Sequence, residues 1–166
     1  MFQVKLIKHQ NTTAQDIKEI IDLKSKQWDF SLDSQLQWIK KNIKNSDFHM
    51  LLILDNKNVA YLNLINIDLT VNGVSKKGLG VGNVCAIEKG KGYGFELMKE
   101  ANRTISNLNK IGLLFCKESL LKFYSSLAWK ELKQGQYRIN CEDSNVMVLN
   151  IDICEGIVID YEGVLF

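Results

Sequence analysis

The chain has 166 residues, of which 46% are hydrophobic and 24% are charged, and these values predict one globular domain over residues 1–166. The net charge of +2, with lysine and arginine spread along the chain, argues against sequence-specific nucleic-acid binding, which needs a concentrated basic face. We also expect no membrane partner and no signal peptide, because no apolar run approaches ~20 residues and residues 1–8 alternate apolar and polar side chains.

Hydrophobic periodicity predicts the elements of the first half of the chain. A strand is expected at residues 2–8. One helix is expected from Thr12 or Thr13 onward and a second at residues 33–45. Three strands are then expected at residues 48–54, 59–69 and 78–87. Either threonine can cap the first helix, because its side chain accepts a hydrogen bond from the backbone of the first turn. Turns are expected at residues 55–58 and at Asn72-Gly73, between the three strands.

In the second half, the strand at residues 78–87 runs into three alternating glycines, which open a helix that continues to about Leu108. A short apolar strand at residues 111–116 follows. The next helix has these apolar positions: Leu120, Leu121, Phe123, Tyr124 and Leu127. Another strand is expected at residues 146–153. Antiparallel strands thus lead into strand, helix, strand, helix and further strands, which favours an α/β domain with a mixed sheet over a doubly wound one.

The segment Lys89-Gly90-Lys91-Gly92-Tyr93-Gly94 is the most informative part of the chain. Glycine lets backbone amides approach a ligand closely, and a helix start offers unpaired N–H groups and a partial positive charge. This combination suits a pyrophosphate. The segment lacks the Gly-Lys-Ser/Thr of a Walker loop, and its glycine spacing differs from the dinucleotide fingerprint. A glycine-rich turn without a ligand is the other alternative.

The order of strand, glycine turn, long helix, strand and helix resembles the GNAT superfamily of N-acetyltransferases. The pyrophosphate signature of that family is matched from Lys89 to Gly94, with Lys89 in place of arginine or glutamine. A second signature is matched by Phe123-Tyr124 and Ala128-Trp129, with Ala128 where glycine is usual. The loop before Lys89 is about two residues shorter than usual and lacks a proline. The resemblance is strongest over residues 80–129.

This resemblance implies a GNAT-like fold, in which helices flank a central, mostly antiparallel sheet with a splayed parallel strand pair. It also implies transfer of an acetyl group from acetyl-CoA to a primary amine of a small molecule or protein, without a metal. Tyr124 would be the general acid that protonates the departing thiolate. Coenzyme-binding residues would be Val84, Cys85, Ala86, Lys89, Gly90, Lys91, Gly92, Tyr93, Gly94 and Phe95. The alternative is a catalytically silent domain that binds acyl-CoA as a sensor or interaction module.

No general base is assigned. The strand at residues 78–87 contains no carboxylate, and the amide of Asn83 cannot act as a base. Glu88 is expected in solvent, and a lone histidine such as His49 is more often structural than catalytic. A chain of water molecules is the remaining option.

Four cysteines lie far apart without a C-x-x-C pair, and with only two histidines this argues against a zinc site. We expect reduced thiols in a cytoplasmic protein. Cys85 and Cys116 end two predicted strands near the expected thioester, but small buried side chains fit them better than an acyl-cysteine intermediate. In relatives the region of Trp28 and Trp38 often lines the acceptor site. The resemblance also allows a homodimer.

Overall fold

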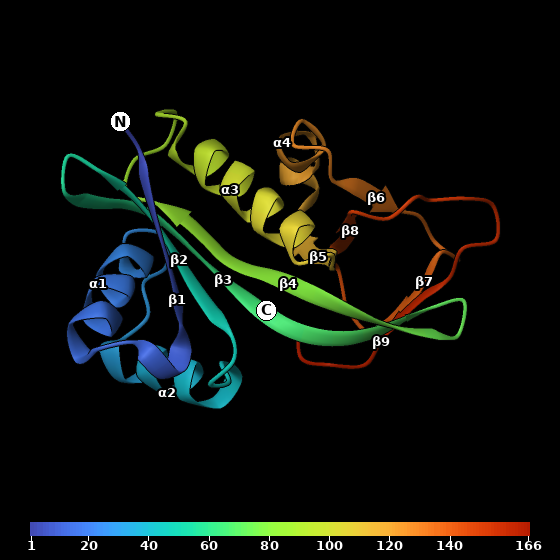
Figure 1. Ribbon diagram of the computed structural model, residues 1–166, viewed down its shortest axis with the longest axis horizontal. Helices are drawn as coiled ribbons and strands as arrows, with labels where there is room; N and C mark the ends of the chain where they lie inside the picture. Colours follow the sequence, from blue (N-terminus) through green and yellow to red (C-terminus); the bar gives the residue numbers. More distant parts are fainter. The chain divides into compact units, whose positions relative to one another are not determined.

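The computed structural model describes residues 1–166 (Figure 1). Its strands are β1 (Gln3–Lys8), β2 (Phe48–Leu54), β3 (Lys57–Val71), β4 (Val74–Ala86), β5 (Ile111–Cys116), β6 (Lys130–Leu132), β7 (Tyr137–Ile139), β8 (Asn145–Leu149) and β9 (Ile159–Tyr161). Its helices are η1 (His9–Asn11), α1 (Ala14–Ser25), α2 (Leu32–Asn42), α3 (Tyr93–Asn107), η2 (Glu118–Leu120) and α4 (Leu121–Ser125). None of them is both long and apolar enough to cross a membrane.

The hydrogen-bonded strand order is β1-β2-β3-β4-β5-β8-β6, and β9 pairs with β3 and β7. Strands β4 and β5 run parallel, but they pair only at Gly78↔Ile111, Leu79↔Gly112 and Gly80↔Leu113. Strand β4 continues beyond this ladder to Ala86. Strands β7 and β9 form a second parallel pair, whereas the pairings of β1 with β2, β2 with β3, and β5 with β8 are antiparallel. The predicted α/β fold, with helices flanking a mixed sheet that contains a parallel strand pair, is confirmed.

The chain forms two compact units. The first contains Met1–Ile65 and Gly82–Ala101, and the second contains Asn66–Val81 and Asn102–Phe166. Strands β3 and β4 and helix α3 each contribute residues to both units. That residues 1–166 act as one domain stays a prediction.

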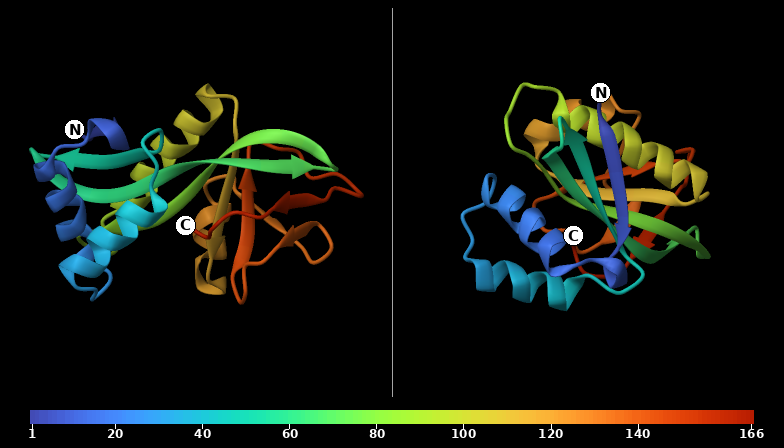
Figure 2. Two further views of the ribbon diagram at one scale, coloured as in Figure 1. Left: turned by 90° about the horizontal axis from the view of Figure 1, so that it is seen from below. Right: turned by 60° about the vertical axis from the view of Figure 1, so that its left-hand side comes forward.

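In the first unit, helices lie on both faces of the strands (Figures 1 and 2). Helices α1 and α2 cover one face, and the first part of α3 covers the other. On the α1 face, one buried cluster joins the helix to three strands through Ile20, Leu23, Leu51, Tyr61 and Cys85. On the α3 face, Leu97 and Met98 are completely buried. Apolar positions at helical spacing thus place the end of β4 between two packed layers.

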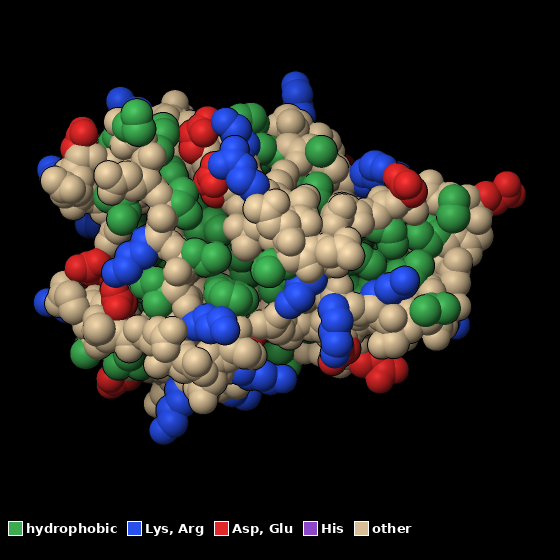
Figure 3. Space-filling view, in the orientation of Figure 1, with side chains coloured by type: hydrophobic (Ala, Val, Ile, Leu, Met, Phe, Trp, Pro, Cys, Tyr) green, Lys and Arg blue, Asp and Glu red, His purple; other side chains and the backbone are tan.

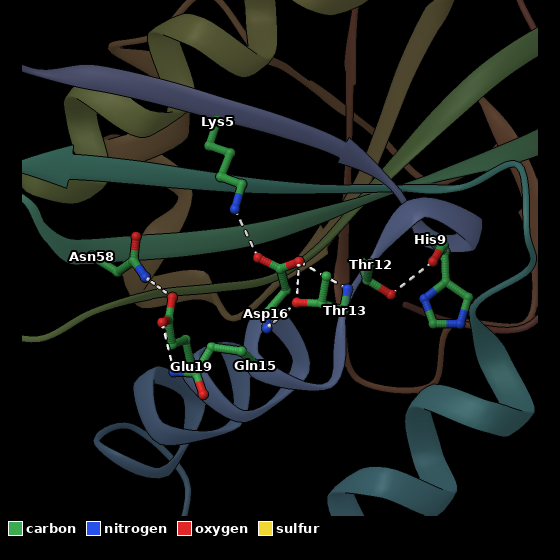
Figure 4. Close-up of polar contacts among 8 residues, drawn as sticks. All are labelled: Lys5, His9, Thr12, Thr13, Gln15, Asp16, Glu19 and Asn58. Carbon is green, nitrogen blue, oxygen red and sulfur yellow. Dashed lines mark hydrogen bonds and ion pairs between the residues drawn. The ribbon is translucent and has the colours of Figure 1, made fainter.

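Helix α1 is tied to the strands by its first turns (Figure 4). Thr13 is its cap: Asp16 N donates to Thr13 Oγ1 at 3.1 Å, and Thr13 N donates to Asp16 Oδ2 at 2.8 Å. Lys5 Nζ on β1 forms an ion pair with Asp16 Oδ1 at 2.7 Å. These hydrogen bonds from Lys5 and Thr13 lower the pKa of the Asp16 carboxyl to about 2. Asn58 on β3 donates to Glu19 at 2.7 Å, so α1 is held at two strands.

In the second unit, Trp129 connects α4 to the end of α3. Trp129 Nε1 donates to Asn102 Oδ1 at 2.8 Å, and Asn102 Nδ2 donates to the Leu127 carbonyl at 2.7 Å. Gly112 on β5 allows this packing, because a Cβ there would lie 2.7 Å from the Trp129 ring. Gly80 on β4 packs against the Phe166 ring in the same way, because a Cβ there would clash with the ring atoms.

Several element ends differ from the predictions. Helix α2 stops at Asn42 because Ile43 adopts an extended conformation, with φ −107° and ψ 121°. Strand β8 ends at Leu149, since Asn150 turns the chain with φ +61°. The predicted turn at residues 55–58 needs only Asp55 and Asn56, whose φ angles of +48° and +60° are those of a two-residue hairpin.

Candidate active site

The glycine turn between β4 and α3 is open and rich in backbone donors. Gly90 and Gly92 have φ angles of +77° and +76°, and a Cβ at either position would meet nothing within 4 Å. Other residues adopt this conformation only at a cost of roughly 1 kcal/mol, which explains the glycines. The first helical hydrogen bond runs from Glu96 N to Gly92 O at 3.0 Å. The N–H groups at the start of α3, at Tyr93, Gly94 and Phe95, are therefore without helical partners.

The charges around this turn suit an anion. Lys89 and Lys91 are exposed within the turn, and the positive end of the α3 dipole faces the same place. Glu96 is paired with Lys99 at 3.0 Å, which offsets its negative charge. The Phe2 ring makes an edge contact with Tyr93, at 6.1 Å between centroids, and so attaches the start of α3 to β1. The residues present fit a pyrophosphate held by main-chain amides.

Across the face drawn in Figure 3, lysine and arginine are scattered among acidic side chains.

Strand β4 leads into this turn through Val84, Cys85 and Ala86. Ile87 N donates to Val59 O at 2.9 Å, so one edge of β4 is used by β3 here. The parallel ladder with β5 ends earlier, at Gly80. The other edge at residues 84–86 is thus suited to hydrogen-bond an extended ligand through its backbone.

The cysteines are buried thiols. Cys85 packs among Ile20, Leu23 and Tyr61, and burial raises its pKa to about 12. Burial also raises the pKa of Cys116 to about 11. Such thiols carry almost no thiolate at neutral pH, which disfavours a covalent acyl-cysteine route.

An unforeseen feature of β4 is the backbone of Asn83. Its φ angle is +53° in the middle of a strand, a conformation that marks bulges and functional positions. Its side chain Nδ2 donates to Asn63 Oδ1 on β3 at 2.6 Å. The Gly82-Asn83 pair in the sequence could have indicated this, since both residue types tolerate positive φ.

His49 on β2 is a structural histidine. Its side chain has no exposed surface, Nδ1 lies 2.7 Å from Tyr61 Oη, and Nε2 lies 3.0 Å from His9 Nδ1. Burial, followed by the charges of His9 and Lys24, lowers its pKa to about 4. With both ring nitrogens engaged, His49 is not placed to take a proton from a substrate. Glu88 is exposed, as expected.

Tyr124 lies in α4, in the second unit, and only 6% of its surface is exposed. Burial, and next the neighbouring Cys116, raises its pKa to about 12. Ala128 has φ +67°, so the position favours a residue without a Cβ. The coenzyme-binding candidates at residues 84–86 and 89–95 all lie in the first unit. A joint role of Tyr124 with them belongs to the proposal below.

Lys24, which the sequence did not single out, is a buried lysine near the end of α1. It is 5% exposed, and its Nζ lies 4.6 Å from the centre of the Trp38 ring on α2. It interacts electrostatically with Cys85 and His49. Trp28, the other tryptophan considered, packs against the cluster beneath α1.

No protein-family model matches the chain, and no curated protein matches its sequence. Solved structures do. The GNAT family N-acetyltransferase YhbS from Escherichia coli, in complex with CoA, is 13% identical with a TM-score of 0.69, over 97% of this chain and 89% of that one. An acyl-CoA N-acyltransferase from Pseudomonas aeruginosa is 15% identical with a TM-score of 0.66, over 89% and 99%. Escherichia coli ElaA is 16% identical with a TM-score of 0.63, over 89% and 99%. The chain has the fold of the GNAT family N-acetyltransferases.

Proposed function

We propose that the chain is an N-acetyltransferase that moves an acetyl group from acetyl-CoA to a primary amine of a small molecule or protein. The observation that carries this proposal is the open glycine turn, whose amides and helix start suit a pyrophosphate. Two of the similar structures are described as an acyl-CoA N-acyltransferase and a GNAT family N-acetyltransferase, and the second was solved with CoA. A cytoplasmic location and a homodimer are part of the proposal on the sequence grounds given above.

The first unit would hold the coenzyme through its backbone. The amides of residues 90–95 would bind the pyrophosphate, with Lys89 and Lys91 adding positive charge. The edge of β4 at Val84, Cys85 and Ala86 would pair with the pantetheine arm and polarise the thioester carbonyl. Because these contacts use main-chain groups, the buried Cys85 side chain can pack in the core at the same time.

Tyr124 would act on the leaving group. Its pKa of about 12 keeps the phenol protonated at neutral pH. A thiol has a pKa of ~8.5, so the phenol stabilises the departing thiolate mainly by donating a hydrogen bond, and complete proton transfer is less favourable. The amine would lose its proton to water, since β4 carries no carboxylate and His49 is enclosed.

Acetyl-CoA binding and turnover test this proposal. At ten times its dissociation constant, acetyl-CoA is expected to stabilise the protein by about 1.4 kcal/mol, seen as a higher Tm. Thiol release against a panel of amines should then identify at least one acceptor. A protein whose Tm does not respond to acetyl-CoA would contradict the proposed function.

Tyr124→Phe is expected to lower kcat at least tenfold while acetyl-CoA affinity stays nearly unchanged, because only the hydroxyl that acts on the thiolate is lost. Thiol-release kinetics and calorimetric titration measure the two quantities. Tyr137→Phe, which removes a hydroxyl from β7 in the same unit, is the matched control and should keep full activity. An unchanged kcat in Tyr124→Phe would remove this residue from the mechanism.

A second candidate is a domain that binds acyl-CoA without catalysis. The absence of a carboxylate from β4 favours it. Acetyl-CoA binding without thiol release from any amine would select this candidate over the enzyme.

A further inference from the structure

One face of the first unit carries hydrogen-bond donors without acceptors. The Lys24 ammonium makes no hydrogen bond and no ion pair, although the residue is 5% exposed. Asn63 on β3 is completely buried, and its Nδ2 has no partner. An enclosed amide without a partner is costly, so Asn63 indicates a missing acceptor, and Lys24 adds a positive charge without an ion-pair partner in the same unit.

The two groups lie over the same part of the sheet. Lys24 interacts electrostatically with Cys85 on β4 and with His49 on β2. Asn63 lies between these strands: it pairs with His49 across β2 and β3, and it accepts a hydrogen bond from Asn83 on β4. All five residues come from the first unit, and Cys85 packs against the α1 residues Ile20 and Leu23.

The charged and titratable groups around this face cannot supply the acceptor. The Asp16 carboxylate is occupied by Lys5 and Thr13, as Figure 4 shows. His49 uses both ring nitrogens on Tyr61 and His9. Trp38 offers Lys24 only the face of its ring. Burial lowers the pKa of Lys24, as expected for an ammonium without a counter-charge.

We propose that the acceptor is an amine that also carries a carboxylate, of the amino-acid type, and that Lys24, Asn63 and Asn83 bind this carboxylate. This rests on the proposed function. Asn83 is partly exposed on β4, one residue before the segment proposed to hold the thioester arm. A carboxylate at Lys24 and Asn63 would give each unpaired donor its acceptor. It would also hold the amine of the same molecule near the edge of β4.

The experiment compares each of the twenty L-amino acids with its carboxamide, which keeps the amine and removes the negative charge. For at least one amino acid, kcat/KM is expected to be at least tenfold higher than for its carboxamide, because KM for the amino acid is lower. In Lys24→Met, the kcat/KM values for the amino acid and its carboxamide should differ by no more than twofold. Lys18 is an exposed lysine of the same helix, and Lys18→Met should preserve the preference. Since Lys24→Met removes an unpaired buried charge, its Tm should equal or exceed that of the wild type, which separates binding from folding. Asn63→Asp, which supplies an internal carboxylate, should also abolish the preference.

Calorimetric titration of the same ligands tests the carboxylate site without turnover. Equal use of amino acids and carboxamides, or a preference that survives in Lys24→Met, would overturn the inference while leaving the acetyltransferase proposal standing. An equal fall of kcat for both ligands in Lys24→Met would also overturn it, because Lys24 would then act on the proton. If acetyl-CoA fails to bind, the proposed function fails. The carboxylate site is then judged by binding alone. It stands if amino acids bind the wild type, while carboxamides do not, and if Lys24→Met binds neither.

Discussion

Acidification from pH 6.5 to pH 4 is expected to remove about 2.5 kcal/mol of unfolding free energy through His49 alone. The side chain is completely buried, and its pKa falls from 6.5 to about 4 on folding. Between these values the unfolded chain binds a proton that the folded chain does not, so stability decreases as the pH falls. Below about pH 4 the folded protein binds this proton as well, and the loss through His49 ends.

Urea unfolding at a series of pH values measures this loss. His49→Gln keeps a hydrogen-bonding side chain but does not titrate, so its stability curve should be flatter than that of the wild type between pH 4 and 6.5. The difference between the curves isolates His49 from the carboxyl groups that titrate in the same range. His9→Gln, at the half-exposed end of the same hydrogen-bonded chain, should keep most of the slope. Parallel curves for wild type and His49→Gln would show that folding does not lower the pKa of His49.

Local patterns in the sequence were sufficient for most of the fold. The strands at residues 48–54 and 111–116 have the predicted bounds, because continuous apolar runs bounded by turn residues admit few alternatives. Thr13 was one of two predicted caps, and its capping box with Asp16 decides between them. The short strands β6, β7 and β9 were not resolved from the sequence, since three-residue strands show too little periodicity.

The candidate site likewise has one part that could be predicted from the sequence and one part that could not. The glycine turn could be predicted because its function depends on backbone conformation, which glycine reveals directly. The cluster of Lys24, Asn63 and Asn83 could not, because it depends on which side chains three separate elements bring to one face. An isolated lysine in an amphipathic helix is expected in solvent, and only the packing of α1 and α2 shows that Lys24 is buried.

Gly92→Asp is expected to weaken acetyl-CoA binding about a hundredfold. The new carboxylate would stand near the pyrophosphate; at about 6 Å and an effective dielectric constant of about 20, the repulsion is about 2.7 kcal/mol. The folded structure should tolerate the change, because aspartate is among the residues that accept positive φ and a Cβ at this position meets no atom within 4 Å. Calorimetric titration with acetyl-CoA measures the affinity.

Gly73→Asp is the matched control for this change. Gly73 lies in the turn between β3 and β4, with φ +79° and nothing within 4 Å of its Cβ position. Both substitutions therefore add the same charge and comparable backbone strain, but only Gly92 lies at the start of α3. If the two variants lose affinity equally, the loss reflects net charge, and if neither loses affinity, the coenzyme binds elsewhere. A selective loss in Gly92→Asp would locate the pyrophosphate at the glycine turn, on which the assignment of acyl transfer depends.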